Sequence, residues 1–124
     1  MSSFDFTNLF ILDLANNHQG DLAHGAKIIS ETSEVVREAN VRAAIKFQFR
    51  DLDSFIHPDH QTGSSAPHIP RFLGTRLSID NYKELFKVVK ENGMLAMCTP
   101  FDESSVEEIV RLGFDLIKVA FKLI

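Results

Sequence analysis

The sequence predicts an α/β fold, namely the N-terminal half of a (β/α)8 barrel with four parallel strands and three helices. Short apolar segments alternate with amphipathic ones along the chain, and residues that favour turns or helix caps separate them. Such alternation is typical of parallel strands joined by right-handed helical crossovers. In addition, each of the four apolar segments carries polar residues, which are Asp13, Lys46 with Gln48, Thr99 and Lys118. We therefore treat residues 1–124 as one partial barrel domain.

The first strand is predicted over residues 9–15, where the sequence reads LFILDLA. A polar turn follows, and its Gly20 can adopt a positive φ angle. Asp21 is suited to cap a helix whose apolar residues repeat at helical spacing as far as Asn40. The second strand, residues 43–49, is short, apolar and rich in aromatic residues.

Residues from about 50 to 77 are expected to form a long loop, because proline, glycine and serine are frequent there. Long loops inside compact domains are commonly functional, so we expect this one to lie at an active site. Ser78 is suited to cap the second helix and Gly93 to end it. A third strand is predicted over residues 94–99.

The last predicted helix begins after Asp102 and ends at Gly113, and a fourth strand is predicted over residues 116–121. Four such parallel strands fit either a doubly wound open sheet or a barrel. Strands of an open sheet that are buried on both faces are normally continuous runs of valine, isoleucine and leucine. In a barrel, polar side chains near the carboxyl ends of all strands converge on one site. Because all four strands carry polar residues, we favour the barrel.

Lys46 and Lys118 lie on alternate strands, in phase with the interior of the predicted barrel. Two ammonium groups ~8 Å apart repel by roughly 2 kcal/mol at an effective dielectric constant near 20. A dianion would relieve this repulsion, so a phosphate or a ligand with both phosphate and carboxylate fits the pair. Two alternatives remain open. Each lysine could extend past the end of its strand to water, or one could form a Schiff base while the other lowers its pKa.

Other polar residues are weaker candidates. The hydroxyl of Thr99 could bind phosphate oxygens, although a threonine at the end of a strand is equally common without a ligand. Asp13 is expected to face a cation or a hydroxyl group, because a lone buried carboxylate is costly. His57 and His60 lie in the loop rather than on a helix that would present both imidazoles, so we assign no metal site to them. Cys98 is expected to be a small core residue.

Composition excludes several classes of protein. The formal net charge of −4 and the scattered lysines and arginines argue against a nucleic-acid partner. No apolar run is long enough to span a bilayer, so no membrane partner is expected. A single cysteine rules out an internal disulfide and suits a reducing compartment, and we expect a cytoplasmic protein.

Four motifs, taken in order, resemble those of the sialic acid (N-acetylneuraminate) synthase family. The first is the acidic residue of the first strand followed by Asn-His-x-Gly-Asp, here residues 13–21. The second is Ile45-Lys46-Phe47-Gln48. The third is Cys98-Thr99-Pro100-Phe101-Asp102, and the fourth is Ile117-Lys118-Val119-Ala120. The chain departs from the family at Asp13, where glutamate is usual, and at Phe121, where serine is usual.

This resemblance implies a transferase of carbohydrate and polysaccharide biosynthesis. Members condense phosphoenolpyruvate with N-acetylmannosamine or a related amino sugar. By resemblance, Lys46, Thr99 and Lys118 would bind phosphoenolpyruvate, and Gln48 and Asp13 would lie beside the sugar or the reacting carbons. We accordingly take Asp13, Lys46 and Lys118 as the candidate catalytic residues. A divalent metal, manganese or magnesium, would polarise the sugar aldehyde, with ligands from parts of the family barrel that this chain does not cover.

The alternatives are another phosphoenolpyruvate-dependent synthase or aldolase of 3-deoxy sugar acids, and a non-catalytic half-barrel. We expect this chain to be inactive by itself. We also expect a homo-oligomer, because the strands at both edges of a half-barrel are open to pairing with other chains.

Overall fold

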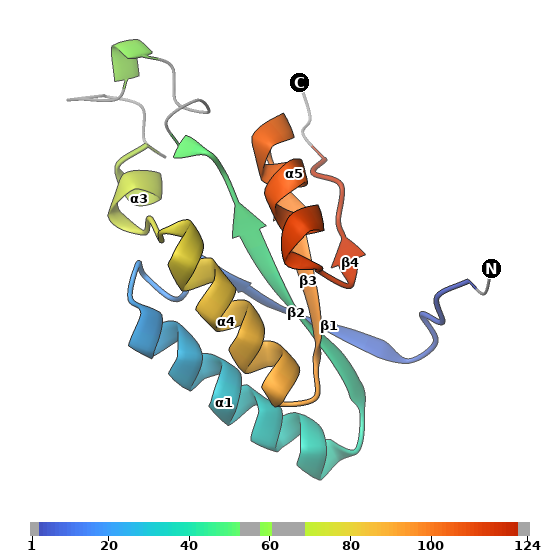
Figure 1. Ribbon diagram of the computed structural model, residues 1–124. Helices are drawn as coiled ribbons and strands as arrows, with labels where there is room; N and C mark the ends of the chain where they lie inside the picture. The colour runs from blue at the N-terminus through green and yellow to red at the C-terminus, as the bar shows by residue number, and fades with distance from the viewer. Residues whose placement is uncertain (1–2, 53–57, 61–68, 122–124) are drawn as a thin grey trace.

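The structure is a computed structural model that describes residues 3–52, 58–60 and 69–121. Its elements alternate between strands and helices, with further helical turns between β2 and α4 (Figure 1). In chain order they are β1 (Leu9–Ala15), α1 (Leu22–Ala39), β2 (Arg42–Phe49), the 3-10 turn η1 (Pro58–His60), α3 (Ile69–Gly74), α4 (Ile79–Glu91), β3 (Leu95–Pro100), α5 (Glu103–Leu112) and β4 (Leu116–Ile117).

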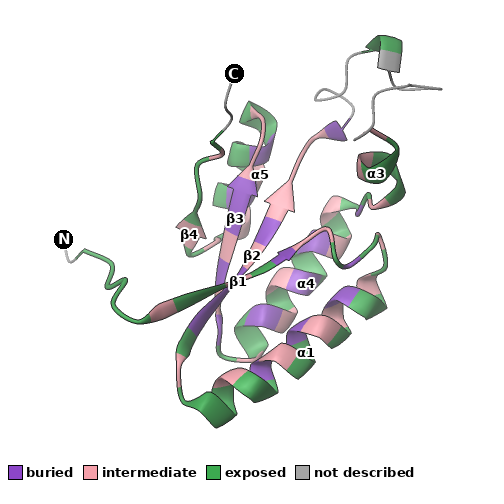
Figure 2. Ribbon diagram, turned by 180° about the vertical axis from the view of Figure 1, so that it is seen from behind, coloured by how far each residue is buried: buried purple, intermediate pink, exposed green. Residues whose placement is uncertain are grey.

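The strands form one parallel sheet in the order β1-β2-β3-β4. Helices α1, α4 and α5 cover one face of this sheet, and no helix of the described chain covers the other (Figures 1 and 2). A doubly wound sheet would reverse its strand order and carry helices on both faces. Sequential order with helices on one face is the arrangement of half a (β/α)8 barrel, as predicted.

The hydrophobic core lies between the sheet and the three helices. Residues in register across parallel strands share a face, and neighbouring residues along a strand face opposite sides. Ile45 and Phe47 of β2, with Ala96 and Cys98 of β3, face the helices and are buried. From the helices, Ile29, Leu85 and Ile109 meet them. In Figure 2 the buried residues are concentrated in β2, β3 and the inner sides of the helices.

Local capping determines where the three long helices begin. The carboxylate of Asp21 accepts a hydrogen bond from the N–H of His24 at 3.0 Å. The hydroxyl of Ser78 accepts one from the N–H of Asn81 at 3.1 Å. At the start of α5 the carboxylate of Asp102 accepts one from the N–H of Ser105 at 2.8 Å. All three caps match the prediction, because capping depends on residues that are close in sequence.

Two elements differ from the prediction. Helix α3, Ile69–Gly74, lies inside the segment predicted as a loop, and Pro70 is accommodated because it occupies the first turn, where its missing N–H has no partner to lose. The fourth strand is Leu116–Ile117 rather than 116–121, since it pairs only with β3. Lys118 therefore lies just beyond the strand, although its N–H still donates to the carbonyl of Cys98 at 3.0 Å.

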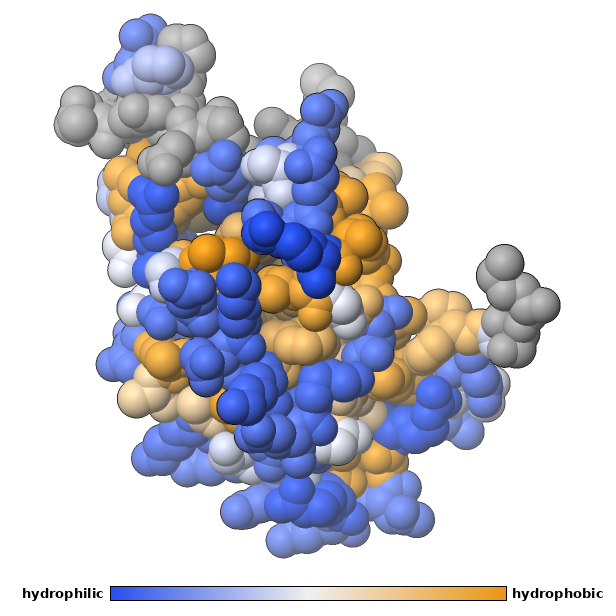
Figure 3. All heavy atoms as spheres, in the orientation of Figure 1, coloured by the Kyte–Doolittle hydropathy of each residue, from blue (hydrophilic) through white to orange (hydrophobic). Residues whose placement is uncertain are grey.

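Hydrophobic side chains are exposed beside the β4 edge of the sheet. Figure 3 shows them on the side of the molecule where α5 and the last described residues lie. Val110 on α5, Val119 and Phe121 are 63 %, 81 % and 81 % exposed. Contiguous exposed apolar groups mark an interaction surface. This surface is the side of the half-barrel on which the next strand and helix of a complete barrel would pack.

Candidate active site

The uncovered face of the sheet carries an ion pair between neighbouring strands. Asp13 of β1 and Lys46 of β2 are in register. The ammonium nitrogen of Lys46 lies 3.1 Å from Oδ2 of Asp13. The lysine side chain is only 13 % exposed, whereas the aspartate side chain is 49 % exposed. The prediction that Asp13 faces a cation is confirmed, but its premise that this carboxylate is buried is wrong. The buried partner is Lys46, and the carboxylate of Asp13 offsets the cost of burying that ammonium group.

Two further candidates follow Lys46 on the same face. Gln48 of β2 is in register with Thr99 of β3, one pleat closer to the carboxyl ends of the strands. Thr99 is 3 % exposed, and its hydroxyl oxygen has no hydrogen-bond partner among the described residues. A buried hydroxyl without a partner is costly, so this group is suited to bind an oxygen of a ligand.

Contrary to the sequence prediction, Lys118 does not lie on a strand facing the candidate site. It lies past the end of β4, and its side chain is exposed. Within the described residues it forms no ion pair, and no contact joins it to Lys46 or Thr99. The structure therefore brings Asp13, Lys46, Gln48 and Thr99 together and leaves Lys118 at the rim.

The end of β1 redirects the chain over the carboxyl edge of the sheet. Between Asp13 and Ala15 the register with β2 shifts by one residue, and Ala15 has a φ angle of 45°. Such irregularities bend a strand and re-aim its side chains near functional sites. The following turn then carries His18 back into the protein, where it is fully buried.

His18 is held as a neutral imidazole. Its Nδ1 accepts a hydrogen bond from the N–H of Gly20 at 3.0 Å, which leaves the proton on Nε2. Its ring lies edge-on to Tyr82, with 6.2 Å between ring centroids. Burial lowers the pKa of His18, with a smaller contribution from the charge of His24. Sequence reasoning treated His18 as a turn residue, and only the folded structure reveals its burial.

Stability is therefore expected to depend on the protonation of His18. Because its pKa is lowered on folding, the unfolded chain binds more protons just below the ordinary histidine pKa of about 6.5. The free energy of unfolding should fall as the pH drops from about 7 through this value. Urea titrations between pH 7 and 5.5 should show this slope in the wild type and a smaller slope in His18→Gln. The control variant His24→Gln, at an exposed position, should keep most of the wild-type slope. Equal slopes in the wild type and both variants would contradict the assignment of this pH dependence to His18.

Asp102 ties the segment after β2 to the start of α5. Besides capping the helix, its carboxylate accepts the N–H of Asp51 at 2.8 Å. The hydroxyl of Ser104 bonds to Asp102 at 3.0 Å and to Asp51 at 3.3 Å. Burial would raise the pKa of Asp102, but the hydrogen bonds from Ser105, Asp51 and Ser104 outweigh it and hold the pKa below its usual value. This network fixes the chain on both sides of the candidate site.

Arg50 is a residue that sequence reasoning missed. Its guanidinium carbon lies 4.3 Å from the ring centroid of Phe72 and 3.8 Å from that of Phe101. Its Nη1 donates to Oε1 of Gln48 at 3.3 Å. Burial lowers the pKa of Arg50, but an arginine remains charged at neutral pH. The only signal in the sequence is its spacing of two residues from Gln48.

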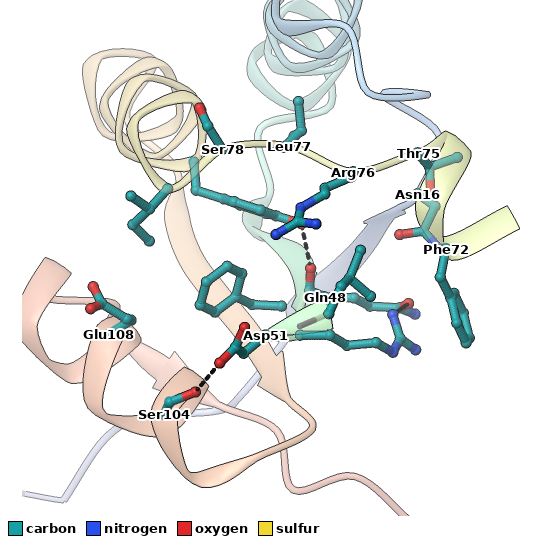
Figure 4. Close-up of a pocket in the computed structure, with 15 residues that line it drawn as sticks. Asn16, Gln48, Asp51, Phe72, Thr75, Arg76, Leu77, Ser78, Ser104 and Glu108 are labelled. Carbon is teal, nitrogen blue, oxygen red and sulfur yellow. Dashed lines mark hydrogen bonds between the residues drawn. The ribbon is translucent and has the colours of Figure 1, made fainter. Parts of the chain in front are cut away.

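A cavity of about 290 Å³ lies beside this site, between the N-terminal parts of α4 and α5 (Figure 4). Gln48 and Asn16 reach it from the strand ends, and Arg76, Ser78 and Glu108 line its other sides. Neither Lys46 nor Thr99 lines this cavity. We therefore place the candidate site on the uncovered face of the sheet, where the paired charges lie, and regard the cavity as its neighbour.

No group of three histidine, cysteine, aspartate or glutamate side chains is arranged to hold a metal within residues 3–52, 58–60 and 69–121. His57 and His68, and the side chain of His60, lie outside the description. Cys98 is fully buried, as predicted, and burial raises the pKa of its thiol to about 12. None of the helices that the structure describes combines the length and apolarity needed to cross a bilayer.

The sequence profile of the NeuB family matches residues 34–123, which is most of the chain. The chain belongs to the NeuB family. The matched residues include Lys46, Gln48, Thr99 and Lys118, so most of the candidate site lies within the NeuB match. A search of curated proteins finds no significant match.

Solved structures show the same fold. The protein assigned as spore coat polysaccharide biosynthesis protein E from Chromobacterium violaceum is 38 % identical, with a TM-score of 0.88 over 92 % of this chain and 34 % of its own. The N-acetylneuraminic acid (sialic acid) synthetase from Leptospira borgpetersenii, solved in complex with citrate, is 20 % identical, with a TM-score of 0.70 over 90 % of this chain and 35 % of its own.

The spore coat polysaccharide biosynthesis protein SpsE from Bacillus subtilis is 18 % identical, with a TM-score of 0.63 over 95 % of this chain and 33 % of its own. This NeuB-family chain thus spans about a third of the length of the structures it matches. The resemblance inferred from the four motifs is confirmed at the level of the family.

Proposed function

We propose that this chain supplies the phosphoenolpyruvate-binding half of a sialic-acid-synthase-type enzyme, which joins phosphoenolpyruvate to N-acetylmannosamine or a related amino sugar. The observation that carries the proposal is the grouping of Lys46, Gln48 and Thr99 on the uncovered face of the sheet, where the hydroxyl of Thr99 has no hydrogen-bond partner among the described residues. An ammonium group beside neutral hydrogen-bond donors suits a ligand that carries both carboxylate and phosphate. Membership of the NeuB family supports the reaction type.

In the proposed reaction, the methylene carbon of phosphoenolpyruvate forms a bond to the aldehyde carbon of the sugar. The aldehyde oxygen takes up a proton and becomes a hydroxyl group. Water adds to the carbon that bears the phosphate, and inorganic phosphate leaves. The products are therefore a 2-keto sugar acid and phosphate, and no oxidant or reductant is required.

The residues of this chain would bind and orient phosphoenolpyruvate, and they would not perform every step of the reaction. Lys46 would neutralise the anion of phosphoenolpyruvate, and Thr99 would donate its hydroxyl proton to a phosphate oxygen. As the anion binds, the ion pair between Asp13 and Lys46 would weaken. The carboxylate of Asp13 would stay solvated, because its side chain is 49 % exposed. By resemblance to the family, Lys118, which lies just past the end of β4, would meet the phosphate from the side of that strand.

The described residues do not provide a site for manganese or magnesium. The one carboxylate on the uncovered face near the proposed ligand, Asp13, is already paired with Lys46 in the part of the chain that is described. No step of the proposed reaction therefore involves a metal bound by these residues.

Ligand discrimination tests the proposed function. Isothermal titration calorimetry should compare phosphoenolpyruvate with pyruvate and with inorganic phosphate, each of which carries one of its two anionic groups. We expect phosphoenolpyruvate to bind at least tenfold more tightly than either, because both of its groups meet donors at once. Equal affinity for phosphate and phosphoenolpyruvate would show that the site binds anions without selecting phosphoenolpyruvate, and it would contradict the proposal.

The half-barrel is also expected to self-associate. The β1 and β4 edges have no further strand partner in the described chain, and exposed apolar residues lie beside β4. Sedimentation velocity over a dilution series should detect a dimer or larger species, and phosphate should strengthen the association by screening the lysines. A compact monomer at every concentration, with or without phosphate, would contradict this expectation.

A further inference from the structure

Gln48 has one side of its amide group engaged and the other side available. A guanidinium can only donate hydrogen bonds, so the amide atom that faces Arg50 must be the oxygen. The 3.3 Å contact from Nη1 of Arg50 to Oε1 of Gln48 fits this requirement. The NH2 group of Gln48 consequently points away from Arg50, and it has no acceptor among the described residues.

Two aromatic rings lie against the guanidinium of Arg50. Phe72 comes from α3 and Phe101 from the segment between β3 and α5, and their ring centroids lie 4.3 Å and 3.8 Å from the central carbon of the guanidinium. Contact with two rings restrains a guanidinium more firmly than contact with one ring does. The backbone of Gln48 is also fixed, because the hydroxyl of Tyr82 donates to its carbonyl at 2.9 Å (Figure 4).

We propose that Arg50, restrained by contacts with Phe72 and Phe101, is a positioning residue that holds the amide of Gln48 in one orientation and presents its two N–H donors to oxygen atoms of the bound substrate. The side chain of an unrestrained glutamine can rotate to offer either an oxygen or an NH2 group. A fixed amide offers its NH2 group on the side away from Arg50, so the site favours an oxyanion or carbonyl oxygen and disfavours a donor at that position. Arg50 acts through Gln48 and need not touch the substrate.

The first experiment measures the motion of the Gln48 amide and requires no ligand. In 15N-labelled protein, the side-chain NH2 resonances of Gln48 are assigned by their absence in Gln48→Ala. Their heteronuclear relaxation should show restricted motion in the wild type and free rotation in Arg50→Met, which keeps an apolar chain against the rings but removes the donors. Phe101→Leu removes one ring contact while retaining Arg50 and should have an intermediate effect. Arg111→Gln, at an exposed ion pair on α5, should leave the resonances unchanged.

Unchanged motion of the Gln48 amide in both Arg50→Met and Phe101→Leu would overturn the inference. Backbone resonances remote from the site show whether each variant is folded. If Arg50→Met does not fold, the decision rests on Phe101→Leu, because that variant keeps the arginine.

The second experiment rests on the proposed function and uses phosphoenolpyruvate as the probe. A double-mutant cycle compares its affinity for the wild type, Arg50→Met, Gln48→Ala and the double variant. If Arg50 acts through Gln48, introducing Arg50→Met into the wild-type protein should weaken phosphoenolpyruvate binding about three- to tenfold. Introducing it into the Gln48→Ala variant should weaken binding less than twofold. Additive losses would mean that Arg50 contacts the ligand directly and would contradict a positioning role. Absence of binding to the wild type would defeat the proposed function, while the amide measurement would still decide the role of Arg50.

Discussion

Replacing Lys46 by methionine is expected to weaken phosphoenolpyruvate binding by more than tenfold. Lys46 is a largely buried cation on the uncovered face, and its side chain is 13 % exposed. Hydrogen bonds to charged groups contribute about 1.5–3 kcal/mol, and about 1.4 kcal/mol corresponds to a tenfold change in affinity. Calorimetric titration of Lys46→Met with phosphoenolpyruvate measures the loss directly.

Lys27→Met is the matched control for this substitution. Lys27 lies on α1 with a side chain that is 71 % exposed, in a surface pair with Glu31. The variant removes the same charge from the protein as Lys46→Met does, so it corrects for any general electrostatic attraction of the anion. Binding that is equally weak in both variants, or unchanged in Lys46→Met, would remove Lys46 from the site.

Truncating Phe47 to alanine is expected to lower the free energy of unfolding by about 3–5 kcal/mol. Phe47 is fully buried at the centre of β2. Its ring packs edge-on against Phe114 and Tyr82, with centroid distances of 5.7 Å and 6.4 Å. The cavity left behind would lie beneath Lys46 and Gln48, so the substitution should also disturb the candidate site. Urea unfolding of both proteins provides the measurement.

Phe6→Ala serves as the control for aromatic truncation. Phe6 is 63 % exposed near the N-terminus, where it contacts Phe4. Its removal should change stability by no more than about 0.5 kcal/mol, as is usual for surface positions. A loss below about 1 kcal/mol for Phe47→Ala would mean that the sheet and helices do not share a single packed core.

The features that depend on residues close in sequence were predictable from the sequence. Asp21, Ser78 and Asp102 mark helix starts because a cap involves only the next few residues. The alternation of strands and helices predicted parallel strands with helical crossovers, and the polar residues carried by all four strands favoured a barrel over an open sheet. The ends of β4 and the existence of α3 were not predictable, since the first depends on strand pairing and the second on the tolerance of Pro70 in a first helical turn.

The candidate site was predictable only in part. The two-residue period of a strand places Lys46 and Gln48 on one face, and parallel register brings Asp13 and Thr99 beside them. The ring contacts of Arg50 were not predictable, because Phe72 and Phe101 come from segments that the fold alone brings together. The burial of His18 likewise depends on packing against Tyr82, which lies on a distant helix.

The most direct test of the account is to map bound phosphoenolpyruvate onto the protein. Spectra of 15N-labelled protein recorded during a titration identify the residues whose resonances move. We predict that the largest shifts fall on Lys46, Gln48 and Thr99 at the carboxyl ends of β2 and β3. Shifts confined to the cavity between α4 and α5, or no shifts at all, would contradict the claim that the uncovered face of this sheet binds phosphoenolpyruvate.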